Sequence, residues 1–167
     1  MNVSRNGEIY GEGEPADYVY GVVRGVVRTY KLLSDGRRQI SAFFFPGEVF
    51  GLEAAGEHRF TAEAVCDANV VFVKRSLLVR LAKQDCHVAN ALWMMSADDL
   101  RRAQEQMLLL GRKSAQERVA AFLLEMAKRA EHGDVVDLPM SRQDIADYLG
   151  LTIETVSRTL TALGSAE

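Results

Sequence analysis

The chain has 167 residues and a mass of 18.5 kDa, enough for one domain or for two small ones. No apolar run approaches the roughly 18 residues of a membrane-spanning helix, and residues 1–14 lack the apolar segment of a signal peptide. Twenty Lys and Arg against 23 Asp and Glu give a net charge of −3, which does not favour a nucleic-acid partner. We therefore expect a cytoplasmic protein, not bound to a membrane, whose function depends on local motifs.

The two cysteines, Cys66 and Cys86, form no CxxC pair and have no histidine at ligand spacing. This pattern disfavours both a disulfide scaffold and a zinc module. We expect both thiols to be packed as small side chains. The three histidines, His58, His87 and His132, are scattered, so we expect neither a metal site nor another cofactor.

The first half of the chain has the pattern of short strands joined by glycine-bearing turns, which predicts an all-β roll over residues 1–80. The Asp35-Gly36 pair predicts a hairpin whose turn needs positive φ at both central positions, and Ile40, Ala42 and Phe44 are expected on one face of the strand that follows. The chain begins almost inside a strand, so the first piece of the roll is expected to be missing. The expected strands are residues 18–24, 26–33, 38–45, 59–64 and 69–74.

From Ser76 to Arg112 the chain lacks proline and has helical periodicity, which predicts one long helix, with residues 81–111 as a dimerisation helix. A seam with alternating spacings of four and three is typical of a helix that pairs with an identical copy. The alternative is a helix that packs this seam on its own sheet; the length of the helix favours self-association. The seam residues are Trp93, Ala97, Leu100, Gln104 and Met107.

The amphipathic pattern of residues 112–167 predicts a helical domain. A first amphipathic helix is expected over residues 114–130, with Val119, Phe122, Leu123 and Met126 on one face. Residues 131–134 end it, and residues 135–138 are long enough only for a connecting strand.

The segment from Met140 to Leu160 has the features of a helix-turn-helix. Ser141 and Asp144 predict a capping box, Ile145 and Leu149 point inward, and the small Ala146 permits a close helix crossing. Gly150 can take the left-handed conformation that ends the first helix, and Thr152 is placed to cap the second. The second helix is expected to bury a stripe formed by Val156, Leu160 and Leu163.

The opposite face of the second helix is the candidate DNA-reading surface, because Glu154, Ser157 and Arg158 lie at i, i+3 and i+4 near its N-terminus. That end enters the major groove in helix-turn-helix proteins. Arginine pairs with guanine, glutamate accepts from cytosine, and serine can serve a base edge or a phosphate. Thr152 and Thr155 are candidates for phosphate contacts, and Glu154 is also an i,i+4 partner for Arg158. Taken without the helix-turn-helix around them, these three residues are more typical of a solvated Glu–Arg pair on a surface helix.

These elements together resemble the CRP/FNR superfamily of bacterial transcription regulators. Glu154-x-x-Ser157-Arg158 is part of this resemblance to the superfamily. Four stretches resemble its FixK branch: Ile9-Tyr-Gly-Glu-Gly13, Val27-Arg-Thr-Tyr-Lys31, Asp35-Gly-Arg-Arg-Gln-Ile-Ser-Ala-Phe43 and Pro46-Gly-Glu-Val-Phe-Gly-Leu-Glu53. The resemblance implies an α+β fold, with an N-terminal β-roll like a cyclic-nucleotide-binding jelly roll, a long dimerisation helix and a C-terminal winged helix-turn-helix. It implies a homodimer that binds double-stranded DNA at a TTGAT-N4-ATCAA palindrome and activates microaerobic and nitrogen-fixation genes.

Departures from other branches refine this expectation. Branches that respond to cyclic AMP carry Gly at the position of Ser157 and Arg at that of Ile153. Leu52 stands near the position of the ribose-binding Glu, and bulky Phe60 follows Arg59, which we expect to be a solvated loop residue. The cysteine group of oxygen-sensing members is absent from this sequence. The resemblance therefore implies no small-molecule effector. A ligand-gated regulator whose roll binds a cyclic nucleotide or another small effector is the alternative.

The resemblance also implies a β-hairpin wing after the second helix, where this sequence stops at Glu167, and an activating contact with RNA polymerase through the loop at residues 53–57. From Arg112 onward, seven Lys and Arg face nine Asp and Glu, so weak non-specific DNA affinity is expected. A third possibility is a dimerisation or partner-binding protein whose DNA domain has lost its function. No nucleophile–base arrangement or glycine-rich phosphate loop indicates an enzyme.

Overall fold

The computed structural model describes residues 1–53, 56–129 and 136–164. The chain divides into two compact units, Met1–Ala103 and Gln104–Glu167, and the division falls within one long helix. Within the described residues, no helix is long and apolar enough to cross a membrane.

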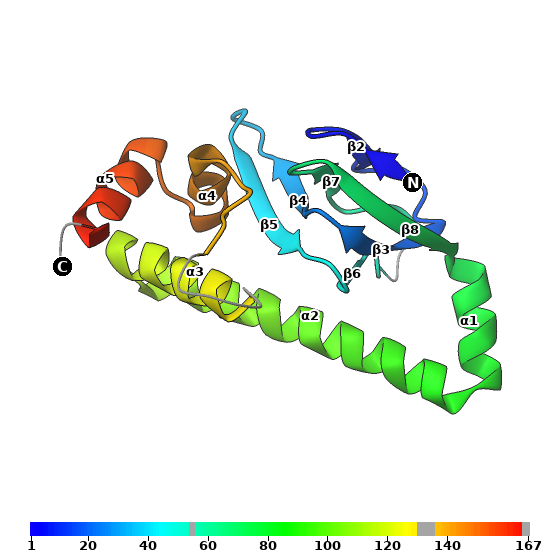
Figure 1. Ribbon diagram of the computed structural model, residues 1–167. Coiled ribbons are helices and arrows are strands. Elements are labelled where there is room, and N and C mark those ends of the chain that lie inside the picture. Colours follow the sequence, from blue (N-terminus) through cyan, green and yellow to red (C-terminus); the bar gives the residue numbers. More distant parts are fainter. Residues whose placement is uncertain (54–55, 130–135, 165–167) are drawn as a thin grey trace. The chain divides into compact units, whose positions relative to one another are not determined.

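The first unit contains a β-roll built from two four-stranded sheets, with orders β1-β8-β3-β6 and β2-β7-β4-β5 (Figure 1). All strand pairs are antiparallel. The α+β class and the β-roll predicted from the sequence are thus confirmed. The strands are β1 (Asn2–Val3), β2 (Glu8–Tyr10), β3 (Tyr18–Arg24), β4 (Val27–Leu32), β5 (Arg38–Phe44), β6 (Val49–Phe50), β7 (Thr61–Ala64) and β8 (Ala68–Lys74).

The hairpin between β4 and β5 forms where Asp35-Gly36 predicts it, but its turn differs from the expected one. Gly36 has φ of +83°, whereas Asn6 is the single non-glycine residue with positive φ in the described parts of the chain. The Gly36 N–H donates to the carbonyl of Leu33 at 2.9 Å, and the Leu33 N–H donates to the carbonyl of Arg37 at 2.8 Å. This is a tight turn followed by one left-handed glycine, so only one position needs positive φ.

The core of the roll lies between its two sheets. Ile40 and Phe44 of β5 are buried and Ala42 is half-buried, as the alternation predicts. Aromatic rings fill much of this interior: the rings of Phe44 and Phe50 lie 5.3 Å apart, as do those of Tyr20 and Phe50. The buried cluster comprises Tyr10, Val22, Val27, Phe44, Phe50, Ala62, Ala64, Ala68 and Val70.

The predicted single helix from Ser76 to Arg112 is wrong: the structure has two helices, α1 (Arg75–Gln84) and α2 (Cys86–Arg112). Asp85 between them is extended, with φ of −132° and ψ of 114°. Its carboxylate accepts a hydrogen bond from the backbone N–H of His87 at 2.8 Å, which caps the start of α2. An N-capping aspartate, rather than proline or glycine, therefore separates the helices.

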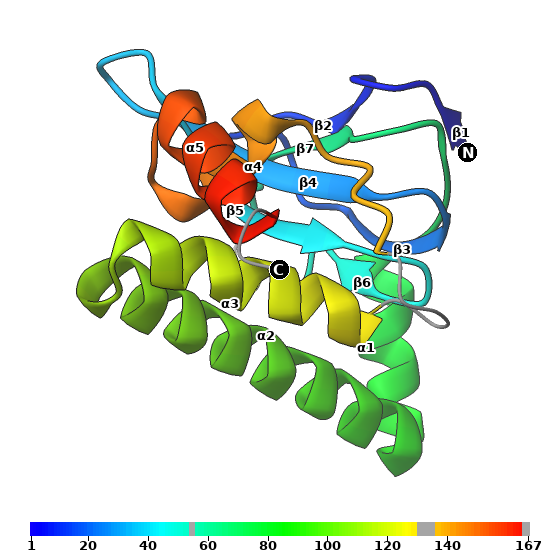
Figure 2. The same ribbon diagram turned by 60° about the vertical axis from the view of Figure 1, so that its left-hand side comes forward.

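The second unit contains the end of α2 together with α3 (Ala115–Arg129), α4 (Arg142–Leu149) and α5 (Ile153–Gly164). Figure 2 shows α5 beside α3. Val119, Phe122 and Met126 of α3 are buried, and Leu123 is half-buried. The predicted connecting strand lies partly outside the described residues, and its described part, 136–138, is not a strand.

The buried stripe of α5 differs from the predicted one. Val156 is fully buried as expected, but Thr159 is the other buried residue. Leu160 is half-buried and Leu163 is 41% exposed. The buried side of α5 therefore consists of Val156 and Thr159, three residues apart, and the C-terminal end of the helix is exposed to solvent.

Candidate nucleic-acid interface

The first helix of the helix-turn-helix begins at a complete capping box. The hydroxyl of Ser141 accepts from the backbone N–H of Asp144 at 3.1 Å, and the Asp144 carboxylate accepts from the backbone N–H of Ser141 at 3.1 Å. Two N–H groups that lack helical partners are thereby satisfied. This fixes the start of α4 where the sequence predicts it.

The turn between α4 and α5 is tight because Gly150 takes the left-handed conformation, with φ of +61° and ψ of 41°. Its N–H donates to the carbonyl of Ala146, and the N–H of Leu151 donates to the same oxygen at 3.0 Å. Ala146 and Leu149 are fully buried, so the two helices cross closely at these side chains. The predicted roles of these residues in the turn are confirmed.

The start of α5 is capped by Thr152, whose hydroxyl accepts from the backbone N–H of Thr155 at 3.2 Å. The two hydroxyl oxygens lie 3.0 Å apart. Thr152 is exposed and Thr155 is half-buried, so the structure brings the two predicted phosphate-contacting residues together at the helix N-terminus. The positive end of the helix dipole adds to an environment that suits a phosphate.

The predicted base-reading residues lie on the solvent side of α5. Glu154 and Arg158 are exposed, and Ser157 is half-buried. Within the described parts of the chain, Glu154 and Arg158 make neither a hydrogen bond nor an ion pair, so the expected i,i+4 pair is not formed. Sequence reasoning missed Arg142 of α4, which donates to the hydroxyl of Ser157 at 3.4 Å and adds a cation to this face.

The predicted dimerisation seam lies along the exposed side of α2. No residue of this helix is buried, and the exposed fractions are 71% for Trp93, 60% for Leu100 and 66% for Met107. Ala97 and Gln104 are also exposed. The alternative in which the seam packs on the chain's own sheet is therefore wrong. A largely apolar stripe on one helix is the surface that a coiled-coil partner would cover.

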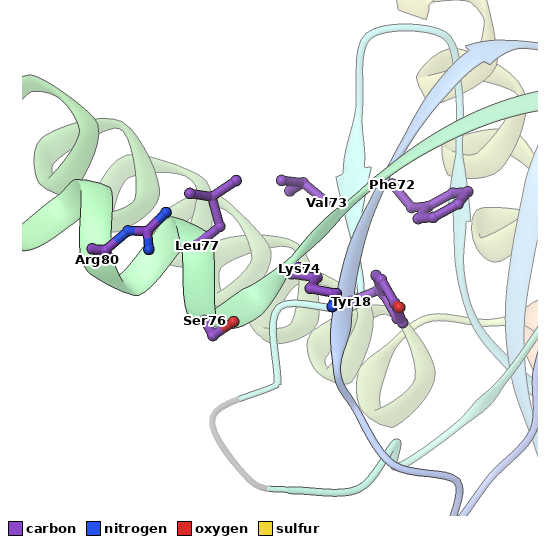
Figure 3. Close-up of a pocket in the computed structure, with 7 residues that line it drawn as sticks. All are labelled: Tyr18, Phe72, Val73, Lys74, Ser76, Leu77 and Arg80. Atoms are coloured by element: carbon purple, nitrogen blue, oxygen red, sulfur yellow. The ribbon is translucent and has the colours of Figure 1, made fainter.

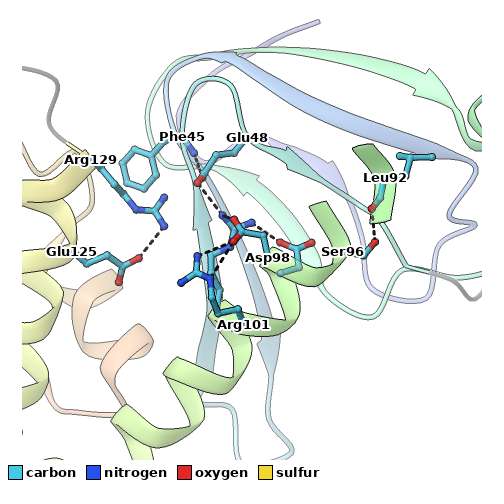
Figure 4. Close-up of polar contacts among 10 residues, drawn as sticks. Phe45, Glu48, Leu92, Ser96, Asp98, Arg101, Glu125 and Arg129 are labelled. Atoms are coloured by element: carbon cyan, nitrogen blue, oxygen red, sulfur yellow. Dashed lines mark hydrogen bonds and ion pairs between the residues drawn. The ribbon is translucent and has the colours of Figure 1, made fainter. Parts of the chain in front are cut away.

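Ion pairs and hydrogen bonds join α2 to the roll within the first unit (Figure 4). Arg102 donates to the carboxylate of Glu48 at 3.0 Å and also pairs with Asp99. The backbone N–H of Phe45 donates to Glu48 at 2.8 Å, so this carboxylate joins the turn after β5 to α2. These charge-assisted hydrogen bonds hold α2 without covering its apolar stripe.

The stretches that resemble the family's nucleotide site, residues 51–53 and 58–62, include a buried histidine that packs against an aromatic ring. His58 is 2% exposed and stacks on Tyr10 with ring centroids 3.5 Å apart. Its Nδ1 lies 3.4 Å from a carboxylate oxygen of Glu53. Burial raises the pKa of the Tyr10 phenol, and the Glu53 carboxylate adds to this shift. The buried histidine was not predicted; Arg59 is exposed, as predicted.

Arg75, the first residue of α1, ties this region together. Its guanidinium donates to the carbonyls of Ala16 at 2.6 Å, of Gly51 at 2.7 Å and of Glu53. Leu52, which stands near the expected ribose position, is half-buried between two of these acceptors. Arg75 therefore links the start of α1 to the backbone just before β3 and just after β6.

The two cysteines differ from each other. Cys66 is half-buried, but Cys86 is exposed at the start of α2, so the prediction that it is packed is wrong. The side-chain ligand atoms of Asp85, Cys86 and His87 lie within 4.8 Å of one another, and all three residues are exposed. The three residues are consecutive, so their proximity follows from the turn between the helices.

A shallow pocket of about 560 Å³ lies where β3 and β8 meet α1 (Figure 3). It combines apolar walls with the cations Lys74 and Arg80, and it lies outside the aromatic interior of the roll. The side chains that line it are Tyr18, Phe72, Val73, Lys74, Ser76, Leu77 and Arg80.

Comparison with known proteins gives matches along nearly the whole chain. Residues 1–85 match the cyclic nucleotide-binding domain, and residues 117–167 match the Crp-like helix-turn-helix domain. The chain is 58% identical over 165 residues to the nitrogen fixation regulation protein FixK of Azorhizobium caulinodans, covering 96% of this chain and 66% of that protein. For FixK of Rhizobium meliloti the identity is 47% over 157 residues, covering 93% and 71%.

Among solved structures, FixK2 from Bradyrhizobium japonicum superposes with a TM-score of 0.96 at 59% sequence identity, covering 99% of this chain and 83% of that one. The chain thus spans about two thirds of the length of the curated relatives described above, 66% and 71%. With both domain families matched and the roll and helix-turn-helix in place, the chain belongs to the CRP/FNR family of bacterial transcription regulators and is similar to its FixK members.

Proposed function

We propose that this chain is a sequence-specific DNA-binding transcription activator that acts as a homodimer in the cytoplasm. Its target is an FNR/FixK-type palindrome, TTGAT-N4-ATCAA, and its genes serve microaerobic growth and nitrogen fixation. The observation that carries this proposal is the exposed face of α5, where Glu154, Ser157 and Arg158 stand together beside a capped helix N-terminus. The FixK relatives, named for the regulation of nitrogen fixation, support the target class.

In this proposal the three residues of α5 read base edges in the major groove. Arg158 donates two hydrogen bonds to guanine, Glu154 accepts from the cytosine amino group, and Ser157 assists at a base edge. Neither Arg158 nor Glu154 is engaged by another described residue, so both are available to a base. Thr152 and Thr155 contact phosphate at the N-terminus of α5.

A dimer places two copies of α5 on successive half-sites, which explains a palindromic target. The exposed stripe of α2, formed by Trp93, Ala97, Leu100, Gln104 and Met107, is the proposed interface. Dimerisation matters here because seven Lys and Arg from Arg112 onward face nine Asp and Glu, which limits the affinity of one copy for phosphate. Two linked half-site contacts compensate through effective concentration.

We propose that DNA binding needs no small-molecule effector. In support, His58 stacks on Tyr10 and Arg75 donates to backbone carbonyls in the region that the resemblance assigns to the nucleotide site. The match of residues 1–85 to the cyclic nucleotide-binding domain is the observation that favours the ligand-gated alternative. Addition of cyclic AMP would raise the melting temperature only under that alternative.

Activation further requires a contact with RNA polymerase, for which the resemblance indicates the loop at residues 53–57. Residues 54 and 55 lie outside the described part of the chain. Glu57 is exposed and Glu53 is half-buried. We propose Glu57 as the part of this loop that is open to a protein partner.

Fluorescence anisotropy tests the proposal most directly. The 167-residue chain is titrated with a TTGAT-N4-ATCAA duplex and with a duplex in which both G·C pairs are replaced, over a series of salt concentrations. Salt-sensitive binding to the first duplex alone is expected. Equal affinity for the two duplexes would overturn base reading. If the chain binds neither duplex, it is extended with the C-terminal region of a FixK relative and measured again. If the extended chain also binds neither duplex, the ligand-gated alternative is favoured.

A further inference from the structure

One arginine joins the ends of two helices in the second unit. The guanidinium of Arg118, on α3, donates from Nη2 to the carbonyl of Leu110 at 2.8 Å and from Nη1 to the carbonyl of Leu149 at 3.0 Å. Its Nε donates to the carbonyl of Lys113 at 2.9 Å. Leu110 belongs to the last turn of α2, and Leu149 is the last residue of α4.

The carbonyls of Leu110 and Leu149 are among those that a helix leaves without partners at its C-terminal end. The negative ends of two helix dipoles, those of α2 and α4, therefore meet the same cation. Each bond is charge-assisted, and a planar guanidinium holds its acceptors in fixed directions. Arg118 is half-buried, so these bonds are screened less than those of a surface pair.

The guanidinium lies beside the turn of the helix-turn-helix. An ideal Cβ built on Gly150 would lie 3.7 Å from Nη1 of Arg118 and 3.6 Å from Leu110. Leu149 and Gly150 lead directly into the capped start of α5. A second bond joins the same helices, because the amide of Gln106 on α2 donates to the carbonyl of Tyr148 at 2.7 Å.

We propose that Arg118 is the positioning residue that fixes the direction of α5 relative to the end of α2, and thereby selects the spacing between the two half-sites. This inference rests on the proposed DNA-binding function. In a dimer paired along α2, the two recognition helices reach both half-sites only if each is held at one angle to that axis. If α5 were held less firmly, each copy of α5 would still read its own half-site. The dimer would then bind palindromes with several different spacings.

The connection that Arg118 makes between the ends of α2 and α4 is first tested without DNA. Leu108→Cys on α2 and Ala162→Cys on α5, both exposed positions, carry spin labels in a chain in which Cys66 and Cys86 are replaced by serine. Labelled chain is diluted with unlabelled chain, and the distance distribution is measured by pulsed electron paramagnetic resonance. Arg118→Gln is expected to broaden the narrow wild-type distribution. An unchanged width would overturn the inference whatever the chain binds.

The second measurement is the affinity for palindromes whose spacer is varied from two to six base pairs, alongside a single half-site. The wild type is expected to prefer one spacer by about tenfold, and Arg118→Gln to reduce this preference to about twofold at similar half-site affinity. The control is Arg112→Gln, which removes an exposed charge at the end of α2 that has no described partner. Its spacing preference should match the wild type, and equal loss in both variants would overturn the inference.

The outcomes separate this inference from the proposed function. A wild type without sequence preference on any duplex would refute the function, while the distance measurement would still decide the role of Arg118. Arg118→Lys covers the case in which Arg118→Gln does not fold. It keeps the charge but cannot hold three carbonyls in the guanidinium geometry, so intermediate broadening is expected. If folded Arg118→Lys gives a distance distribution as narrow as that of the wild type, the proposed role of the guanidinium geometry is contradicted.

Discussion

Ser141 and Asp144 cap α4 reciprocally: each side chain accepts a hydrogen bond from the other residue's backbone N–H, and the Ser141 hydroxyl donates to the Asp144 carboxylate at 2.8 Å. Asp144 is only 3% exposed, so this carboxylate depends on these donors in place of water. The cap therefore links the stability of α4 to the geometry of the whole helix-turn-helix.

Replacement of the capping serine is expected to destabilise the second unit. Ser141→Ala removes a hydroxyl that both accepts and donates, and should lower the free energy of unfolding by about 0.5–2 kcal/mol. Urea unfolding followed by circular dichroism measures this loss. Ser96→Ala serves as the matched control, because the Ser96 hydroxyl only donates back to the carbonyl of Leu92 within α2. A control effect as large as that of Ser141→Ala would contradict the capping role.

Arg158→Ala is expected to weaken specific DNA binding by about 1–3 kcal/mol and to relax the preference at the guanine that it reads. The reason is that a bidentate contact specifies one base, whereas phosphate contacts are independent of sequence. Thr155→Val provides the contrast: it should weaken binding to all duplexes by a similar factor. Anisotropy titrations on the palindrome and on single-base variants distinguish the two patterns, and a uniform loss for Arg158→Ala would refute base reading.

A charge on the exposed stripe of α2 is expected to separate the dimer. Leu100→Glu places two like charges at a coiled-coil seam, where they lose hydration without a partner. Sedimentation velocity should then show monomers at concentrations at which the wild type is dimeric. The matched control is Leu124→Glu on α3, where Leu124 is 64% exposed, close to the 60% of Leu100, but lies off the seam. A dimeric Leu100→Glu, or a monomeric control, would contradict the proposed interface.

Tyr30 provides a test by pH. Its hydroxyl donates to the carboxylate of Glu63 at 2.8 Å. Two effects raise the pKa of Tyr30 to about 12: burial, which is the larger, and this hydrogen bond. Because the folded-state pKa lies above the unfolded value of about 10, the stabilisation is complete below pH 10 and is lost as the pH rises towards 12. Tyr30→Phe should therefore cost about 0.5–1.5 kcal/mol near neutral pH.

Chemical denaturation at several pH values from 8 to 12 gives the comparison. The difference between wild type and Tyr30→Phe should shrink above pH 10. Tyr18→Phe is the control, since the Tyr18 hydroxyl makes no hydrogen bond to any described residue and its ring packs edge-on against Phe72. A difference for Tyr30→Phe that stays constant up to pH 12 would show that the phenol–carboxylate bond does not stabilise the roll.

The sequence predicted the local features well because each depends on a few neighbouring residues. The Ser141 cap, the left-handed Gly150 and the Thr152 cap follow from side chains that bond to backbone within three residues, or from the absence of a Cβ. The strands from Tyr18 to Phe44 follow from alternation and from the turn at Gly36. The break at Asp85 had a similar local signal, an N-capping aspartate, in a stretch otherwise typical of one helix.

Other features depend on packing between distant segments. The buried side of α5 passes through Thr159 instead of Leu160 and Leu163, because contact with α3 and α4 decides which residues lose water. The burial of His58 against Tyr10 joins residues 48 positions apart in the sequence, which no periodicity reveals. Glu154 and Arg158 likewise do not pair, since an exposed i,i+4 pair gains little in water.

The sequence by itself determined that a β-roll precedes a helical region, the helix-turn-helix with its caps, and the residues predicted to contact DNA, since these depend on local backbone preferences and on hydrophobic period. Only the tertiary structure decided that the seam of α2 is exposed and that Arg118 meets the carbonyls of Leu110 and Leu149. The physical reason is that an arginine finds unpaired carbonyls at helix ends only after those ends have been brought together in space, and the sequence does not state that arrangement.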